Sequence, residues 1–257
     1  MILYLGQGRL IYLPRSYYSG MPEFEQVNIV SYLSNGKKQH VFLPERKRTE
    51  PPDRVWWVFG GNGSLALDWI GFLDSAPADS GITFVLFDYP GYGLNEGSPN
   101  PHRIADSIDD ALPPVAEAFD ISKDELIERS SVLGHSLGAA VAFDFADRYE
   151  LDRIVAVSPF TTMEEMAKRT MGAWVTPLLT HRYDNEKALD GILHSGKKVR
   201  ITIFHGEEDR LIPMAMGQSL AARDKDGDAI EFIPVPKAGH NDVISRILYE
   251  LIHLFEV

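Results

Sequence analysis

Segments of strand type alternate with segments of helix type along most of this 257-residue chain. Six short apolar runs have the character of strands that are covered on both faces; they are residues 55–59, 82–87, 131–133, 154–157, 199–204 and 230–233. This alternation predicts a mostly parallel sheet with helices on both faces. A chain of this length can form such a sheet as one unit, so we expect residues 1–257 to make a single α/β domain.

The chain begins and ends with recognisable patterns. Residues 27–33 and 39–43 are two apolar runs joined by Asn35-Gly36, which predicts an antiparallel hairpin and brings the sheet to about eight strands. Near the end, apolar residues recur at helical spacing and predict one continuous helix; they are Ile244, Ile247, Leu248, Leu251, Ile252 and Phe255.

One stretch, residues 161–185, interrupts the alternation and lies within a possible insert at 159–190. Its apolar residues fall roughly on one helical stripe: Met163, Met166, Ala167, Met171, Trp174 and Leu178. The stripe is compatible with a surface helix packed on the core or with a short cap over a pocket. In the second case we expect Met171 and Trp174 to contact substrate.

The residues that point to chemistry begin with Gly134-His135-Ser136-Leu137-Gly138. This Gly-x-Ser-x-Gly sequence follows an apolar strand and precedes a helical pattern. A sharp turn in this position displays a serine at the carboxyl end of a strand, and its glycines leave room for the neighbouring strand and helix. The pattern predicts that Ser136 is a nucleophile.

A serine hydroxyl needs a base, and the base needs an acid that holds its tautomer. Of the eight histidines, His240 lies in a loop between the last strand and the last helix. Asp209 follows the strand at 199–204 and is the expected acid, with Glu207, Glu208 and Asp242 as local alternatives. The order is Ser136, Asp209, His240.

A developing oxyanion needs backbone N–H donors. Leu137, the residue after the nucleophile, should supply one. The other is expected from the glycine-rich loop Gly60-Gly61-Asn62-Gly63 after the strand at 55–59, with Asn62 as the favoured donor. A nucleotide-binding loop is not expected there, because no Gly-Lys-Ser/Thr follows.

Together, the Gly-His-Ser-Leu-Gly turn, the stretch from His205 to Pro213 and the Gly239-His240-Asn241-Asp242 loop resemble the α/β-hydrolase superfamily. Residues 87–93, Phe-Asp-Tyr-Pro-Gly-Tyr-Gly, look like the superfamily's turn after its fourth strand. The resemblance implies the α/β-hydrolase fold, and within the superfamily it is greatest to small esterases, acyl-protein thioesterases and peptidases.

The chain departs from the superfamily pattern at two positions. Gly60 stands where the oxyanion loop of relatives usually has histidine, and Asn95 stands where they often have serine, a change expected to matter little. Relatives also often carry a hydrophobic anchor before a segment like Gln7 to Tyr12. Residues 1–13 are too short to cross a bilayer.

These features predict a serine hydrolase that cleaves a carboxylic ester or thioester through an acyl-enzyme on Ser136. A peptidase with the same triad and a non-catalytic binding protein on the same scaffold are the alternatives, and fold alone does not decide among them. The sequence leaves open the natural substrate, the acyl length and the oligomeric state.

Composition restricts the partners of the protein. The net charge of −12 disfavours nucleic acid, and the chain has no cysteine for disulfides or thiolate metal sites. We expect a small acyl ester or thioester as the partner and no metal or cofactor. A soluble, cytoplasmic protein is the default expectation; membrane attachment or a periplasmic location would require a longer chain with an anchor or leader.

Overall fold

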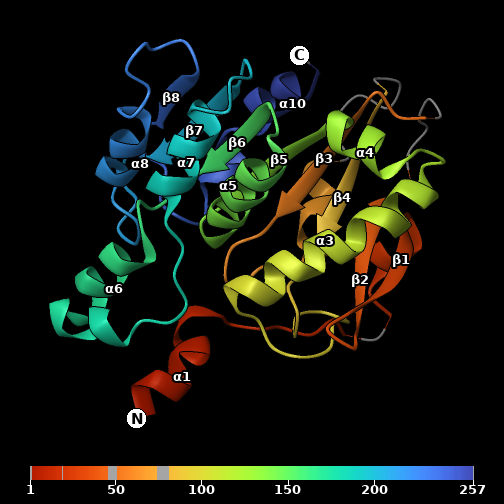
Figure 1. Cartoon of the computed structure of the whole chain (residues 1–257), viewed down its shortest axis with the longest axis horizontal. Helices are drawn as coiled ribbons and strands as arrows, with labels where there is room; N and C mark the ends of the chain where they lie inside the picture. Colours follow the sequence, from red (N-terminus) through yellow and green to blue (C-terminus); the bar gives the residue numbers. More distant parts are fainter. Residues whose placement is uncertain (1, 19, 46–50, 74–80, 257) are drawn as a thin grey trace.

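The sheet of the computed structural model has eight strands in the order β1-β2-β4-β3-β5-β6-β7-β8 (Figure 1). The structure describes residues 2–18, 20–45, 51–73 and 81–256. The strands are β1 Val27–Ser34, β2 Lys37–Pro44, β3 Arg54–Phe59, β4 Ile82–Phe87, β5 Ser130–His135, β6 Arg153–Val157, β7 Arg200–Gly206 and β8 Ile230–Val235. From β4 to β8 all neighbours are parallel. The expected eight-stranded, mostly parallel sheet is confirmed.

The hairpin at the sheet edge follows from its two turn residues. Asn35 and Gly36 have φ angles of 51° and 69°, the left-handed values that a two-residue type I′ turn requires. They set the register that pairs Ser34 with Lys37. β2 is also antiparallel to β4, so the hairpin extends the parallel part of the sheet at one edge.

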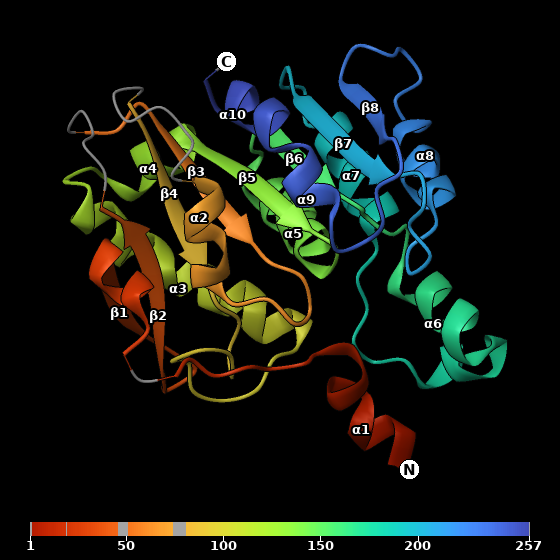
Figure 2. The same cartoon turned by 180° about the vertical axis from the view of Figure 1, so that it is seen from behind.

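Helices cover both faces of the sheet (Figures 1 and 2). One face carries α3 Pro101–Ala118, α4 Lys123–Arg129, α5 Leu137–Tyr149, α7 Asn185–Leu193 and α8 Met214–Ala221. The other carries η2 Ala66–Trp69, α2 Ile70–Leu73, α9 Val243–Arg246 and α10 Leu248–Glu256, with the short η1 Pro22–Gln26 before β1. Each face has its own apolar cluster, which explains why the central strands are apolar on both sides.

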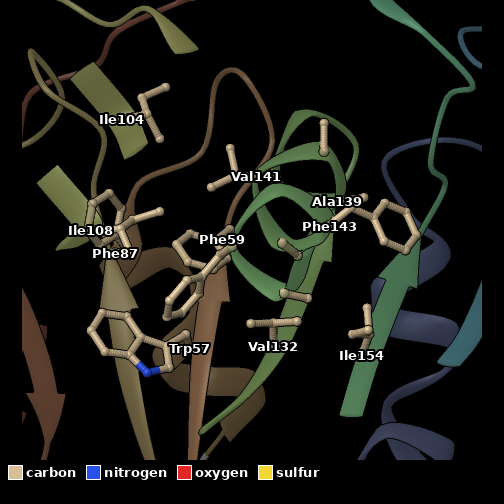
Figure 3. Close-up of a cluster of buried hydrophobic side chains, with 14 of the residues drawn as sticks. Trp57, Phe59, Phe87, Ile104, Ile108, Val132, Ala139, Val141, Phe143 and Ile154 are labelled. Atoms are coloured by element: carbon tan, nitrogen blue, oxygen red, sulfur yellow. The ribbon is translucent and has the colours of Figure 1, made fainter. Parts of the chain in front are cut away.

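The larger cluster lies between the sheet and the α3–α5 layer (Figure 3). Phe145 of α5 packs edge-on against Trp57 and Phe59 of β3, with ring centroids 5.4 and 6.2 Å apart. The buried indole N–H of Trp57 has a hydrogen-bond acceptor, because Nε1 donates to Ser130 Oγ over 3.0 Å. These contacts fix α5 on β3 and β5, and therefore fix the turn that joins β5 to α5.

The C-terminal helix is not continuous, contrary to the prediction. It breaks at Ile247, whose φ and ψ are −104° and 15°, into α9 and α10. Ile244, Ile247, Leu251 and Phe255 are nevertheless buried. The spacing of apolar residues correctly predicts which residues face the core. The one-residue interruption at Ile247 leaves the same side of α9 and α10 buried.

The stretch after β6 leaves the sheet and returns to it at one place. It contains α6 Met163–Met171 and η3 Ala173–Leu178. Its two ends are joined by a bridge between Thr162 and Asp184, with Met163 N donating to Tyr183 O over 2.8 Å. We call residues 163–183 the cap. It projects from the end of the sheet to which the β3, β4, β5 and β7 arrowheads point, where α1 Ile2–Ile11 also lies (Figure 2).

No helix in the described part of the chain has the length and apolar character needed to cross a membrane.

The aromatic contact between α5 and β3 predicts a large stability effect. Phe145→Ala removes a fully buried ring, so the free energy of unfolding should fall by about 3–5 kcal/mol. Urea denaturation at pH 7 measures this. Leu33→Ala, which removes a side chain that is 70% exposed on β1, is the control and should change stability by about 0.5 kcal/mol or less. Equal effects of the two variants would contradict this account of the core.

Candidate active site

Ser136 lies in the sharp turn between β5 and α5. Its φ and ψ are 57° and −117°, a conformation that costs free energy for a residue with a side chain. The turn is held on one side by Ser136 N, which donates to Val157 O of β6 over 2.9 Å. The hydroxyl is thereby presented at the carboxyl end of the sheet, at the N-terminus of a 13-residue helix.

The two glycines of the turn are required by close backbone contacts. A Cβ on Gly138 would lie 2.0 Å from the carbonyl oxygen of Phe59, and one on Gly134 would lie 2.2 Å from the carbonyl oxygen of Gly138. Backbone on both sides cannot move aside as a flexible side chain can. The Gly-x-Ser-x-Gly pattern is therefore a packing requirement of strand against helix.

The structure brings Ser136, His240 and Asp209 into one hydrogen-bonded chain. His240 Nε2 lies 2.9 Å from Ser136 Oγ, and His240 Nδ1 lies 2.7 Å from Asp209 Oδ2. The three come from the ends of β5, β7 and β8 and their following loops. The arrangement allows His240 to accept the serine proton at Nε2 while Asp209 keeps the other ring nitrogen protonated.

Asp209 is buried but well supplied with donors. Its Oδ1 accepts from the amides of Leu211 at 3.0 Å and Ile212 at 2.8 Å. Burial alone would raise the pKa of Asp209, but the hydrogen bonds from His240 and Ile212 outweigh it and hold the pKa below its usual range. The carboxylate is therefore ionised and can stabilise a charged imidazole.

The alternative acids lie elsewhere. Glu207 and Glu208 are exposed. Asp242 accepts from Gly239 N at 2.7 Å and pairs with Arg246 at 2.5 Å. Asp242 occupies the N-cap position of α9, but its carboxylate makes no capping hydrogen bond to that helix and instead closes the loop that carries His240.

Two further histidines support the site. His135 Nε2 donates to the carbonyl oxygen of His240 over 3.0 Å, and the two rings lie 5.0 Å apart. His205 Nε2 donates to Ile212 O over 2.8 Å, which shapes the loop that presents Asp209. Burial lowers the pKa of both, that of His135 to about 4, so both are neutral at pH 7.

The two expected oxyanion donors lie in residues beside the serine. Asn62 and Leu137 line the same pocket as Ser136. Within the described ranges neither amide has a hydrogen-bond acceptor. Unpaired N–H groups beside a nucleophile are what an oxyanion hole consists of. The positive end of α5 adds favourable potential at the same point.

The loop that carries Asn62 is held by two tyrosines that the sequence analysis did not assign. Tyr89 OH donates to Gly60 O, and Tyr92 OH donates to Asn62 O, both over 2.6 Å. Both rings are buried in the turn after β4. The only signal in the sequence was the Tyr-Pro-Gly-Tyr turn, which indicated the fold and not this contact.

An apolar cavity of about 220 Å³ opens beside Ser136. One wall comes from the cap, through Met163, Met166, Met171, Val175, Leu178 and Leu179. Other lining residues are Leu10 and Ile11 of α1 and Leu211 and Ile212. The stripe of the insert therefore faces a pocket, as the cap hypothesis requires.

Met171 and Trp174, the two predicted substrate contacts, lie differently relative to the cavity. Met171 lines the cavity, whereas Trp174 does not and is 61% exposed. Trp174 does not continue the stripe into the cavity wall, because α6 ends at Met171 and Gly172 turns the chain with a φ of 94°; its contact with substrate stays a prediction. The helical spacing that would have aligned Trp174 with Met171 stops there.

No group of three or more metal-ligating side chains occurs among the residues that the structure describes.

Comparison with known proteins finds similarity to α/β hydrolases. A family model described as "Serine aminopeptidase, S33" matches residues 75–193, less than half of the chain, and includes Ser136 but neither Asp209 nor His240. A protein of Acanthamoeba polyphaga mimivirus named as an alpha/beta hydrolase is 24% identical over 246 residues, which cover 94% of this chain and 87% of that protein.

Human alpha/beta hydrolase domain-containing protein 17C is 28% identical over 157 residues, 61% of this chain. The aligned part spans 44% of the human protein, less than half of its length. Among solved structures, the Pyrococcus furiosus esterase Pf2001 has a TM-score of 0.72 and 17% identity, with 96% of each chain covered. At that identity the likeness concerns the fold.

The neutral, buried His135 predicts a pH dependence of stability. Its folded pKa of about 4 lies below the ordinary 6.5, so its stabilising contribution is complete above pH 6.5 and is lost as the pH falls toward 4. Between pH 7 and pH 5 this loss should be about 2 kcal/mol. His135→Gln keeps a donor but cannot titrate. From pH 7 to pH 5 the free energy of unfolding of the variant should therefore decrease by about 2 kcal/mol less than that of the wild type, as measured by urea denaturation. Parallel pH profiles of the two proteins would contradict the assignment.

Proposed function

We propose that this chain, which has the α/β-hydrolase fold, is a serine hydrolase that cleaves a carboxylic ester or thioester of an apolar acyl group. The observation that carries this proposal is the hydrogen-bonded chain from Asp209 through His240 to Ser136 at the mouth of an apolar cavity. Unpaired amides of Asn62 and Leu137 support it.

The proposed reaction has two halves. In the first, Ser136 Oγ attacks the substrate carbonyl and gives its proton to His240 Nε2; the oxyanion is bound by the two amides, and His240 then protonates the leaving alcohol or thiol. In the second, His240 removes a proton from water, which attacks the acyl-enzyme; the bond between Ser136 Oγ and the acyl carbon then breaks, His240 returns the proton to Ser136 Oγ, and the acid is released. Asp209 remains ionised throughout and stabilises the imidazolium.

The cavity supports an acyl group of moderate size. Its volume is about 220 Å³. A protein cavity of roughly 150 Å³ binds benzene, which has six carbon atoms. In proportion, this cavity would hold an acyl group of about eight to ten carbon atoms. The lining residues are uncharged, so a chain of methylenes would be bound by desolvation alone. Each buried methylene contributes about 0.8 kcal/mol.

A peptidase is the second candidate, and the match to a serine aminopeptidase model favours it. An aminopeptidase must hold a charged α-amino group, and burying that charge without a carboxylate partner is costly. Among the described residues that line the cavity there is no Asp or Glu. This favours an ester or thioester over a peptide.

The triad is tested by labelling and by kinetics. A fluorophosphonate probe should label the wild-type protein at Ser136, and Ser136→Ala should abolish labelling. Asp209→Asn should lower kcat on p-nitrophenyl esters on the order of ten-thousand-fold, because tautomer control is lost. Glu207→Gln is the control and should stay within about twofold of wild type. Labelling that persists in Ser136→Ala, or an essential Glu207, would reject the assignment.

The cap is tested with a matched pair of substitutions. Met171→Ala removes a cavity wall and should lower kcat/KM for octanoyl esters about fivefold while leaving acetyl esters unchanged, since only the longer chain reaches the cap. Trp174→Ala removes a larger side chain from the same cap but outside the cavity, so its chain-length profile should match wild type. A shifted profile in Trp174→Ala alone would mean that the cap adopts another arrangement when substrate binds.

A further inference from the structure

The N-terminal segment lies beside the site without a role in the reaction described above. Residues 7–13, here called the strap, are the second half of α1 and the two residues after it; α1 lies beside the chain that follows η3 of the cap (Figures 1 and 2). Gln7, Leu10 and Ile11 line the cavity. The strap is therefore already part of the cavity wall, and its attachments show what holds it there.

Gln7 attaches the strap to the cap. Its side chain is buried, at 6% exposure, which is unusual for glutamine. Its Oε1 accepts from Thr180 N at 2.7 Å, Thr180 Oγ1 at 3.0 Å and His181 N at 3.4 Å, and its Nε2 donates to Leu178 O. One amide group thus satisfies the backbone on both sides of Leu179, a residue that lines the cavity.

Tyr12 reinforces this attachment. It is 1% exposed, and its ring lies 5.6 Å from that of His181. The strap and the cap loop are consequently packed together as well as hydrogen-bonded. A cap loop without this attachment would leave backbone donors and acceptors unpaired in an apolar wall, which is costly.

At its other end the strap is attached to the oxyanion loop. Asn62 Nδ2 donates to Ile11 O over 3.1 Å, and Leu13 N donates to Asn62 O over 3.0 Å. Asn62 is therefore held through its side chain and through its carbonyl. The same residue lines the cavity with Ser136, and its amide is the second oxyanion donor of the proposed reaction.

We propose that the strap completes the active site: Gln7 is a specificity-determining residue that fixes the cap wall, and the Asn62 side chain is a positioning residue that orients the Asn62 amide. This inference rests on the proposed hydrolase function, because it assigns the strap to the acyl group and the oxyanion of that reaction. The two attachments make separate contributions, since one contacts the cavity wall and the other the donor loop.

Gln7→Leu tests the first attachment. Leucine keeps the volume but leaves the Thr180 and His181 amides without their acceptor. In the wild type, kcat/KM on p-nitrophenyl esters of two to ten carbons should rise about fourfold per methylene until the cavity is filled. In Gln7→Leu the rise should fall below about twofold per methylene, mainly through KM, with acetyl esters little changed. Gln218→Leu, the same change at an exposed glutamine of α8, should keep the wild-type slope.

Asn62→Ala tests the second attachment. The variant keeps the backbone amide and loses the donation to Ile11, so kcat should fall about tenfold alike for all chain lengths, with little change in KM. A wild-type kcat in Asn62→Ala, or a wild-type slope in Gln7→Leu, overturns the corresponding half of the proposal. Loss of folded protein would also lower the apparent kcat without changing KM, so kcat is expressed per active site titrated with fluorophosphonate, and a lowered melting temperature identifies a variant that does not fold.

Hydrogen exchange separates failure of this inference from failure of the proposed function. The amides of Thr180 and His181 should exchange at least tenfold faster in Gln7→Leu than in the wild type or in Gln218→Leu. Unchanged exchange overturns the attachment whether or not the protein hydrolyses esters. Faster exchange in a wild-type protein that cleaves no ester and takes no fluorophosphonate supports the attachment and rejects the hydrolase.

Discussion

The close approach of α5 to β3 is the constraint on which the site depends. Gly138 lies against the Phe59 carbonyl so tightly that a Cβ would fall 2.0 Å from it. To reach that position directly after β5, the chain must turn at Ser136 through a φ of 57°. The strain at Ser136 is offset by burial of aromatic and apolar side chains between α5 and the sheet. The hydroxyl and the Leu137 amide are then placed without any mobile loop.

The electrostatics of the site follow from burial combined with directed hydrogen bonds. Asp209 remains ionised in an enclosed position because two amides and His240 donate to it. His135 and His205 are buried too and each hydrogen-bonds a carbonyl oxygen; burial lowers the pKa of each ring and, for His205, outweighs Asp209 Oδ2 at 3.6 Å, so both stay neutral. Three histidines close together thus have different tasks: one faces the serine, and the other two hold the loops of His240 and Asp209.

The features of the fold and site that could be predicted from the sequence are those determined by residues close together in the chain. Strand positions followed from apolar runs, and the elbow followed from glycines that permit a tight turn. Asn95 shows the opposite case: it was expected to matter little, yet it is buried and joins Asp88 O at 2.7 Å to His40 N at 2.6 Å. Nothing local to Asn95 indicates that β2 will lie beside it.

The position of Trp174 and the contacts of Gln7 could not be predicted for a related reason. Helical spacing was extended through Gly172, where a φ of 94° ends it. Gln7 and Thr180 are 173 residues apart. A glutamine among apolar residues gives no indication in the sequence of which distant residue it will hydrogen-bond. Contacts between segments that are far apart depend on the complete fold, so the cavity walls were the least predictable part of the site.

The division between a fixed reaction centre and a variable cavity follows from these differences in packing. Substitutions at Gly134 or Gly138 would place atoms inside neighbouring backbone, so chemistry tolerates almost no change there. The cavity wall is made of partly exposed side chains such as Leu10, Met171 and Leu211, where changes cost little stability. A chain with this elbow can therefore keep its reaction while its acyl preference changes with a few cap and strap residues. For this reason the motifs indicate the type of bond cleaved more strongly than they indicate the substrate.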